Sequence, residues 1–101
     1  MIFLRRFGEL IDRQLDLFRE EHSELIAECD DALRRYDAAD RDEAGEHYER
    51  FGDLQEEVNE ALEDLRDGYA ATLDEQLAKR YVAEFDRTTA RRFRGIWLAD
   101  T

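Results

Sequence analysis

The sequence contains no proline, only five glycines and a single cysteine, Cys29, among its 101 residues. So few helix breakers and turn formers argue against a β-sandwich or barrel and favour a small number of long helices. One cysteine cannot form an intramolecular disulfide. No apolar run approaches the roughly 20 residues of a transmembrane helix, and residues 1–4 are too short for the apolar part of a secretory signal. We therefore expect an all-α protein with a single domain over residues 1–101, located in the cytoplasm and without membrane contact.

Charged side chains are abundant and mostly acidic. Asp and Glu number 27 against 15 Lys and Arg, which gives a net charge of −12, while 43% of the residues are hydrophobic. That apolar fraction is sufficient for a core, so disorder is not expected. Lys79 is the only lysine. A carboxylate-rich, lysine-poor composition resembles that of proteins from extreme halophiles, whose net charge keeps them soluble in concentrated salt. A GC-rich genome, which favours arginine codons, is the alternative explanation.

The first third of the chain carries apolar residues at alternating steps of three and four. This heptad pattern predicts one unbroken helix over residues 3–37, on the order of 50 Å long at about 1.5 Å per residue. The pattern is lost over residues 37–43, where Asp40 and Glu43 have the spacing of an N-cap and its following carboxylate, so we expect a turn there. The seam of this helix consists of Leu4, Gly8, Ile11, Leu15, Phe18, His22, Leu25, Cys29, Ala32 and Tyr36.

Two further helices are expected, over residues 41–67 and 73–94. Gly68 can take the left-handed conformation that ends the first of them, and Gly95 can end the second. Thr72 and Glu75 have the spacing of a capping box that opens the last helix. The two apolar seams are Ala44, Tyr48, Phe51, Leu54, Val58, Ala61 or Leu62, Leu65 and Tyr69, and then Leu77, Ala78, Tyr81, Val82, Phe85, Thr89, Phe93 and Ile96.

Such short connections place consecutive helices antiparallel. The expected architecture is therefore a long antiparallel helical hairpin with a third helix along it, similar to a three-helix bundle. Because the first helix is longer than the third, part of the hairpin seam would lack cover in a monomer. We expect a homodimer that completes a bundle of four or six helices.

No set of residues suited to catalysis or metal binding converges in the sequence. His22 and His47 are expected at different heights of the hairpin, and neither helix has the Glu-x-x-His step of four-helix di-iron proteins. Cys29 lies on the seam, where a thiol packs as a small hydrophobe. The chain has neither a Gly-rich phosphate loop nor a Cys-x-x-Cys pair, and Ser23 is its only serine. We expect no enzymatic activity, no metal and no cofactor.

An acidic stripe follows steps of four and three along the second predicted helix; it consists of Asp53, Glu57, Glu60, Asp64 and Asp67. Like charges one turn apart destabilise a helix by about 0.2–0.5 kcal/mol per pair at low salt. A solvated face suited to high salt is the favoured interpretation. Binding of divalent cations or of a basic partner, and mimicry of a phosphate backbone, are the alternatives.

An arginine stripe marks the last helix and consists of Arg80, Arg87, Arg91 and Arg94. Residues 76–101 carry six basic and three acidic groups, whereas residues 1–75 carry nine basic and twenty-four acidic groups. Because the acidic body would repel a polyanion, nucleic acid is not the expected partner. We expect the arginines to pair with acidic faces of the same molecule or of its dimer mate. Arg92 falls within the apolar arc, where it needs a buried carboxylate or a path to solvent at the helix end.

Trp97 lies near one end of the chain, where a cap over the bundle is the favoured interpretation and an anchor for a partner is the alternative. Together these features predict a non-enzymatic protein–protein interaction or assembly module. A regulatory protein that acts on nucleic acid or its machinery, through the arginine stripe or by acidic mimicry, is the alternative function. The candidate partner-binding residues are Arg80, Arg87, Arg91, Arg94 and Trp97.

Overall fold

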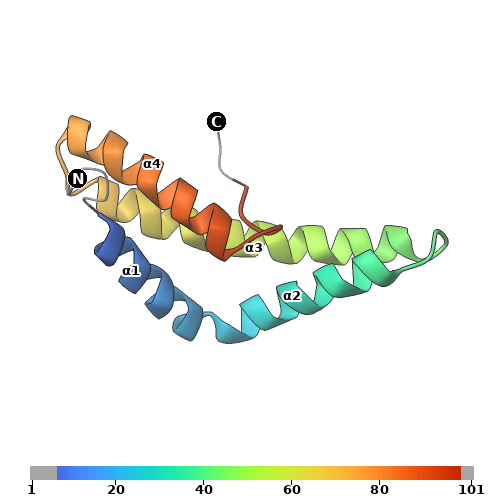
Figure 1. Ribbon diagram of the computed structural model, residues 1–101. Coiled ribbons are helices and arrows are strands. Elements are labelled where there is room, and N and C mark those ends of the chain that lie inside the picture. Colours follow the sequence, from blue (N-terminus) through green and yellow to red (C-terminus); the bar gives the residue numbers. More distant parts are fainter. Residues whose placement is uncertain (1–6, 99–101) are drawn as a thin grey trace.

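A computed structural model describes residues 7–98, which form four helices and no strand. These helices are α1 (Gly8–Glu21), α2 (Ser23–Ala38), α3 (Ala44–Ala70) and α4 (Glu75–Arg92). Figure 1 shows α2 and α3 side by side as an antiparallel hairpin, with α4 lying over one half of α3 and α1 turned away from the line of α2. The all-α class is confirmed, with four helices in place of the three expected.

The first predicted helix is divided in two at His22. The backbone of His22 leaves the helical region, with φ −115° and ψ 30°, although its N–H still donates to Phe18 O at 2.9 Å. The bend lets α1 contact α4 while α2 follows α3 (Figure 1). One straight helix could not do both, so tertiary packing outweighs the unbroken heptad pattern. The prediction of a single helix over residues 3–37 was therefore wrong, and its residues 3–6 lie outside the described residues.

The second predicted helix continues past its expected stop. α3 runs through Gly68 to Ala70, and among the described residues only Gly95 has a positive φ, of 83°. The carbonyl groups at the end of α3 are satisfied in another way, because the hydroxyl of Thr72 donates to Tyr69 O at 2.7 Å and the N–H of Ala71 donates to Asp67 O. No left-handed residue is needed there. The prediction that Gly68 ends this helix was wrong.

The boundary between α3 and α4 is set by Asp74. Its Oδ1 accepts a hydrogen bond of 2.9 Å from Leu77 N, the geometry of an N-cap. The predicted capping box assigned this role to Thr72, which instead closes the preceding turn. At the other end, α4 stops at Arg92 and Gly95 takes the left-handed conformation in the turn that follows, close to where the sequence predicts the stop.

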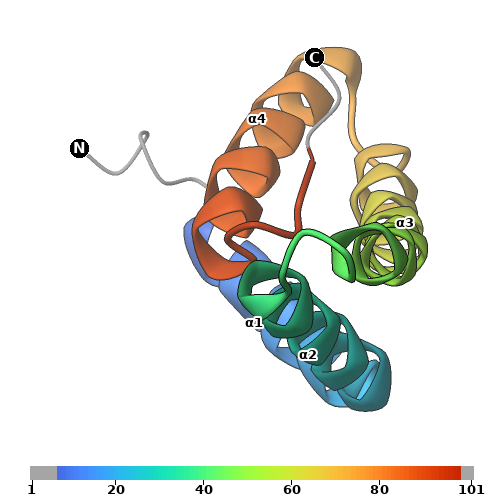
Figure 2. The same ribbon diagram turned by 90° about the vertical axis from the view of Figure 1, so that its right-hand side faces the viewer.

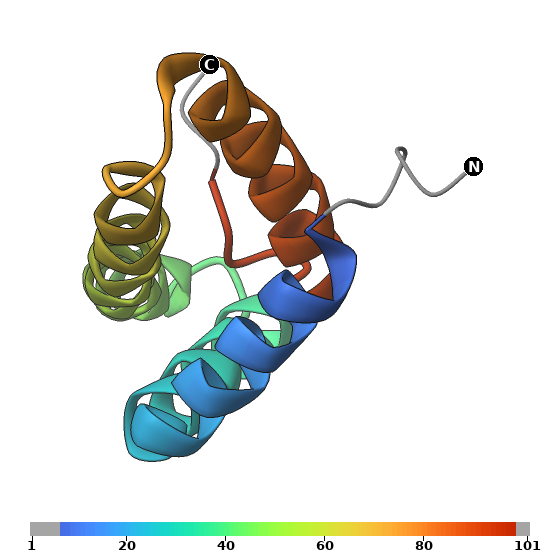
Figure 3. The same cartoon turned by 90° about the vertical axis from the view of Figure 1, so that its left-hand side faces the viewer.

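The core lies where α1, α3 and α4 surround the end of the chain. Seen along the hairpin, these helices form three sides around residues 93–98 (Figures 2 and 3). The fully buried side chains come from every helix and include Ile11, Leu15, Cys29, Val58, Leu62, Tyr81 and Phe85. All eight positions of the first seam from Gly8 to Ala32 are buried or partly buried, as expected of a helix interface.

The hairpin extends beyond this core as two helices alone. α4 ends part-way along α3, so the far end of the α2–α3 hairpin has no third helix over it (Figure 1). The connection between α2 and α3 is the expected turn, in which Asp40 Oδ1 accepts from Glu43 N at 3.1 Å. We call residues 36–49, which comprise this turn and the helix ends on both sides of it, the hairpin tip.

Candidate functional site

The acidic stripe lies along the solvent face of α3. Its five carboxylates, Asp53, Glu57, Glu60, Asp64 and Asp67, are all exposed. The opposite face of the same helix carries the buried residues Phe51, Leu54, Val58 and Leu62. The sequence therefore placed the stripe on the correct side of the helix, and of its members only Asp67 forms an ion pair within residues 7–98, with Arg66.

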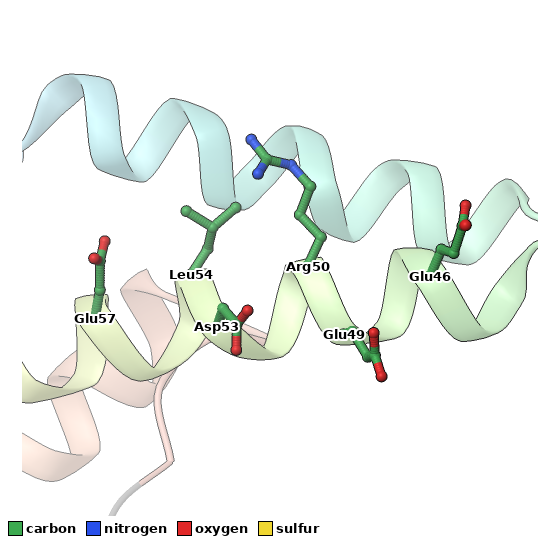
Figure 4. Close-up of a pocket in the computed structure, with 6 residues that line it drawn as sticks. All are labelled: Glu46, Glu49, Arg50, Asp53, Leu54 and Glu57. Carbon is green, nitrogen blue, oxygen red and sulfur yellow. The ribbon is translucent and has the colours of Figure 1, made fainter.

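The stripe continues toward the hairpin tip in a shallow groove of about 390 Å³ that Glu46, Glu49, Asp53 and Glu57 line together with Arg50 and Leu54. Figure 4 shows the side chain of Arg50 turned toward α2, while Glu49 and Asp53 point away from it. Arg50 reaches Glu28 of α2, with 3.9 Å between Nη2 and Oε2. Glu46 and Glu49 are members of the acidic face that the predicted stripe left out, although both continue its helical spacing.

The carboxylates of this face do not form a chelating cluster. In the described part of the chain, no group of three or more His, Cys, Asp or Glu side chains is arranged to hold a metal ion. His47 Nε2 lies 3.9 Å from Oε2 of Glu43, the residue before α3, and His22 packs its ring on Phe18 with 4.4 Å between centroids. His22 lies between α1 and α2 and His47 lies on α3, and the two have different neighbours.

The arginine stripe lies on the outer side of α4 and its following turn. Arg80, Arg87, Arg91 and Arg94 are exposed, and within residues 7–98 none of them forms an ion pair. Arg91 makes one long contact, from Nη2 to Thr88 Oγ1 at 3.5 Å. The expected pairing of these arginines with acidic faces of the same molecule is absent within residues 7–98, and their pairing with a dimer mate stays a prediction.

Arg92 does find a carboxylate, on α1. Its Nη2 lies 2.6 Å from Asp16 Oδ1, and its Nη1 donates to Asp12 O at 3.0 Å. Asp16 is exposed, so of the two alternatives for Arg92 the structure favours a path to solvent at the helix end and not a buried carboxylate. This pair joins the end of α4 to the middle of α1, so Arg92 has a structural role.

Trp97 is part of the core. It is 7% exposed, its ring meets Phe85 edge to face at 6.0 Å between centroids, and the guanidinium of Arg66 lies 5.8 Å from the ring centroid. Burial removes Trp97 from the surface that a partner could contact in this fold. Of the two interpretations of Trp97, the structure favours the cap over the bundle, and Trp97 does not lie with the arginine stripe as a binding residue.

Three polar residues of α3 have structural roles that the sequence did not reveal. Asn59 Nδ2 donates to Ile96 O at 2.8 Å, and Asn59 Oδ1 accepts from Leu98 N at 2.8 Å. Gln55 Nε2 also donates to Ile96 O, at 3.1 Å. Arg66 is nearly buried and bonds Asp67 at 2.8 Å and Asp86 at 3.0 Å, and these hydrogen bonds raise its pKa despite burial. All three flank the apolar seam of α3, which is the signal that could have identified them.

Two buried groups have raised pKa values. Burial, with the charge of Asp30 as a second cause, raises the pKa of the Cys29 thiol to about 11. Burial raises the pKa of Tyr81 to about 12, although its hydroxyl donates to Gln14 Oε1 at 2.8 Å. Both groups are therefore protonated at neutral pH, and the Cys29 thiol has little nucleophilic character.

An aromatic pair of the half-buried Tyr36 and the exposed Tyr48 marks the side of the hairpin beyond the end of α4. Tyr48 is 60% exposed and its ring lies 5.5 Å from that of Tyr36 across the two helices. Gln55 and Asn59 of α3 bind the backbone of Ile96. Tyr48 and Gly52 precede them at helical steps of four and three, and therefore lie on the same side of α3.

On α2, Leu33 lies beside the turn that follows α4. A Cβ on Gly95 would lie 3.4 Å from Leu33 Cδ2, so the turn after α4 reaches α2 there. Asp37 follows Leu33 by one helical turn and lies on the same side of α2. We call the surface that begins beyond this turn the open hairpin face; it consists of Leu33, Tyr36, Asp37, Tyr48 and Gly52.

None of the helices is both long enough and apolar enough to cross a membrane, within residues 7–98. Comparisons with protein-family models, with curated proteins and with solved structures find no match to this chain. The open hairpin face, the acidic stripe and the arginine stripe are therefore the features from which a function has to be derived.

Proposed function

We propose that the protein is a non-enzymatic assembly module that associates with a second copy of itself. The observation that carries this proposal is the incomplete cover of the α2–α3 hairpin: α4 and residues 93–98 pack on one half, and the other half leaves Tyr48 60% exposed. Large exposed aromatic side chains are characteristic of protein–protein contact surfaces, where they supply most of the binding free energy.

A second copy is the simplest cover for such a surface. Two hairpins that each lack a partner over the same half can cover one another in a two-fold arrangement, because each offers the same patch that the other lacks. The result would be a four-helix contact of the kind that antiparallel bundles use. This proposal agrees with the dimer that the unequal helix lengths predict.

Light scattering on a size-exclusion column tests the proposal. We expect a mass of twice the 12.0 kDa chain in about 0.15 M salt and in about 1 M salt, since burial of apolar side chains does not depend on charge attraction. A mass of one chain at both salt concentrations, with full helical circular dichroism, would contradict self-association.

The arginine stripe supports a second candidate function, binding to nucleic acid or its machinery. Arg80, Arg87 and Arg94 form no ion pair with the described residues and are free to contact phosphates. Binding of this kind would weaken steeply with salt, with a slope set by the number of phosphates contacted. A salt series with DNA and RNA that shows no binding at about 50 mM salt, where such contacts are strongest, would exclude it.

A further inference from the structure

We infer that the open hairpin face receives the hairpin tip of a second copy, and that the acidic residues of that tip lie against the arginine-bearing end of α4. This inference rests on the proposed self-association and specifies where the two copies meet. In a two-fold pair each tip would cover the open face of the other copy, so the same contact would be made twice.

The open hairpin face is continuous with a surface that the chain already uses for packing. Gln55 and Asn59 of α3 bind the backbone of Ile96 and Leu98, and Leu33 of α2 contacts the turn at Gly95. Toward the hairpin tip, the same sides of α2 and α3 continue to Asp37 and Tyr48, which are both exposed. Leu98, at the boundary, is 61% exposed and would extend the apolar surface offered to the partner.

Charge identifies which part of the second copy fits beside this surface. The hairpin tip, residues 36–49, carries six acidic side chains and one arginine. The chain end that borders the open face, residues 91–98, carries three arginines and no acidic residue. Arg92 is already paired with Asp16, whereas Arg91 and Arg94 form no ion pair within the described residues. An acidic tip placed beside Arg91 and Arg94 would provide the carboxylates that the arginine stripe lacks within its own molecule.

The apolar residues and the charges have different parts in this contact. Exposed ion pairs contribute little free energy, so the tip and the arginines alone would not hold two copies together. Burial of Tyr36, Tyr48 and Leu98 would supply the affinity, because aromatic side chains at the centre of an interface dominate binding. The charges would fix the antiparallel orientation, since the parallel alignment would place two acidic tips side by side.

Sedimentation velocity of purified variants at about 0.15 M salt tests the inference, with circular dichroism to establish that each variant is folded. Tyr48→Ala should weaken the dimer by on the order of thirtyfold, the effect of losing an interface hot spot. Leu17→Ala is the matched control, because Leu17 is a 49% exposed side chain of α1, outside the open face, and its loss should leave the dimer unchanged.

A pair of charge-reversed proteins tests the placement of the tip. Arg91→Glu with Arg94→Glu should weaken self-association of one protein, and Asp37→Arg with Asp42→Arg should weaken that of the other. An equimolar mixture of the two should associate again, because each reversed tip then meets a reversed end. Lys79→Glu with Arg80→Glu, exposed residues near the start of α4, should have no such effect.

The outcomes separate this inference from the proposed function. A wild-type protein that is a monomer overturns both. A wild-type dimer that is unaffected by Tyr48→Ala, or charge-reversed proteins that do not associate again on mixing, would overturn the placement of the tip while leaving self-association intact. A dimer weakened by Tyr48→Ala and restored by mixing the reversed pair would confirm the placement.

Discussion

The side chain of Asn59 holds the backbone on both sides of Trp97. Its amide nitrogen donates to Ile96 O and its oxygen accepts from Leu98 N, each at 2.8 Å. The N–H groups of Ile96 and Trp97 donate to Phe93 O at 3.0 Å, whereas Ile96 O and the N–H of Leu98 find a partner on α3 through this side chain. The pair of bonds keeps Trp97 over Phe85 and thereby closes the core between α3 and α4.

Replacement of Asn59 should loosen this end of the chain. In Asn59→Ala the N–H of Leu98 loses its only partner within residues 7–98, and Ile96 O keeps only Gln55 there. We expect the free energy of unfolding to fall by about 1–3 kcal/mol, the usual effect of leaving part-buried polar groups unpaired. Urea unfolding followed by Trp97 fluorescence measures the effect. Gln76→Ala, at an exposed position of α4, is the control and should change stability by less than about 0.5 kcal/mol; an equal loss in both variants would contradict the role of Asn59.

Trp97 should behave as a core residue. We expect Trp97→Ala to destabilise the protein by about 3–5 kcal/mol, because it leaves a cavity beside Phe85 and Arg66. Trp97→Phe keeps an aromatic ring in place and should lose less. Thermal unfolding by circular dichroism distinguishes the two variants. Unchanged stability in Trp97→Ala, combined with lost binding of a partner, would instead identify Trp97 as a surface anchor.

Stability should fall at alkaline pH. The pKa of Cys29 is raised from 9.0 to about 11 and that of Tyr81 from 10.0 to about 12, so the folded state keeps both protons at pH values where the unfolded chain has released them. Because the unfolded state then binds fewer protons, the free energy of unfolding decreases as pH rises from about 9 to about 12. Each pKa unit corresponds to about 1.4 kcal/mol.

The variants Cys29→Ala and Tyr81→Phe separate the two contributions to this alkaline loss. Each should remove its own part of the pH dependence between pH 9 and pH 12, whatever its effect on stability at pH 7. Urea unfolding at a series of pH values gives the slopes directly. A slope that is the same in the wild type and in both variants would assign the alkaline loss to other groups.

The acidic stripe should make the fold more stable in salt. Its carboxylates are one turn apart and exposed, so their mutual repulsion weakens as ions screen it. Glu60→Gln with Asp64→Asn should raise stability in dilute buffer by a few tenths of a kcal/mol and reduce the gain seen on adding salt. As a control, Glu9→Gln with Glu24→Gln removes equal charge from the first turns of α1 and α2, where acidic residues stabilise, and should not raise stability. A gain of the same size in both pairs would point to net charge and not to the stripe.

Much of the fold follows from local patterns in the sequence. The apolar steps of three and four identify the helices and most of the buried residues, from Ile11 to Phe93, because a helix that packs against neighbours must repeat its apolar side at that spacing. The turn at Asp40 was recognised for the same reason, since it combines the loss of the apolar pattern with a capping residue.

The features that were missed depend on contacts between distant parts of the chain. The residues around His22 do not show that the first helix must bend there, because the bend depends on the packing of α1 against α4. Gly68 has the right residue type for a helix stop, but Thr72 satisfies the helix end instead. Asn59 and Gln55 are ordinary polar residues until Ile96 is brought beside them. The arginine and acidic stripes, in contrast, could be identified in the sequence because the residues of each follow helical spacing along one short segment of the chain.

The central claim is that a second copy covers the hairpin tip, and hydrogen–deuterium exchange at two protein concentrations tests it most directly. Between a concentration well above and one well below the dissociation constant of the dimer, amides of residues 33–50 should lose protection on dilution, while those in the middle of α1 and α4 should not. Protection of residues 33–50 that is the same at both concentrations, in a sample that light scattering shows to change from dimer to monomer, would contradict the claim.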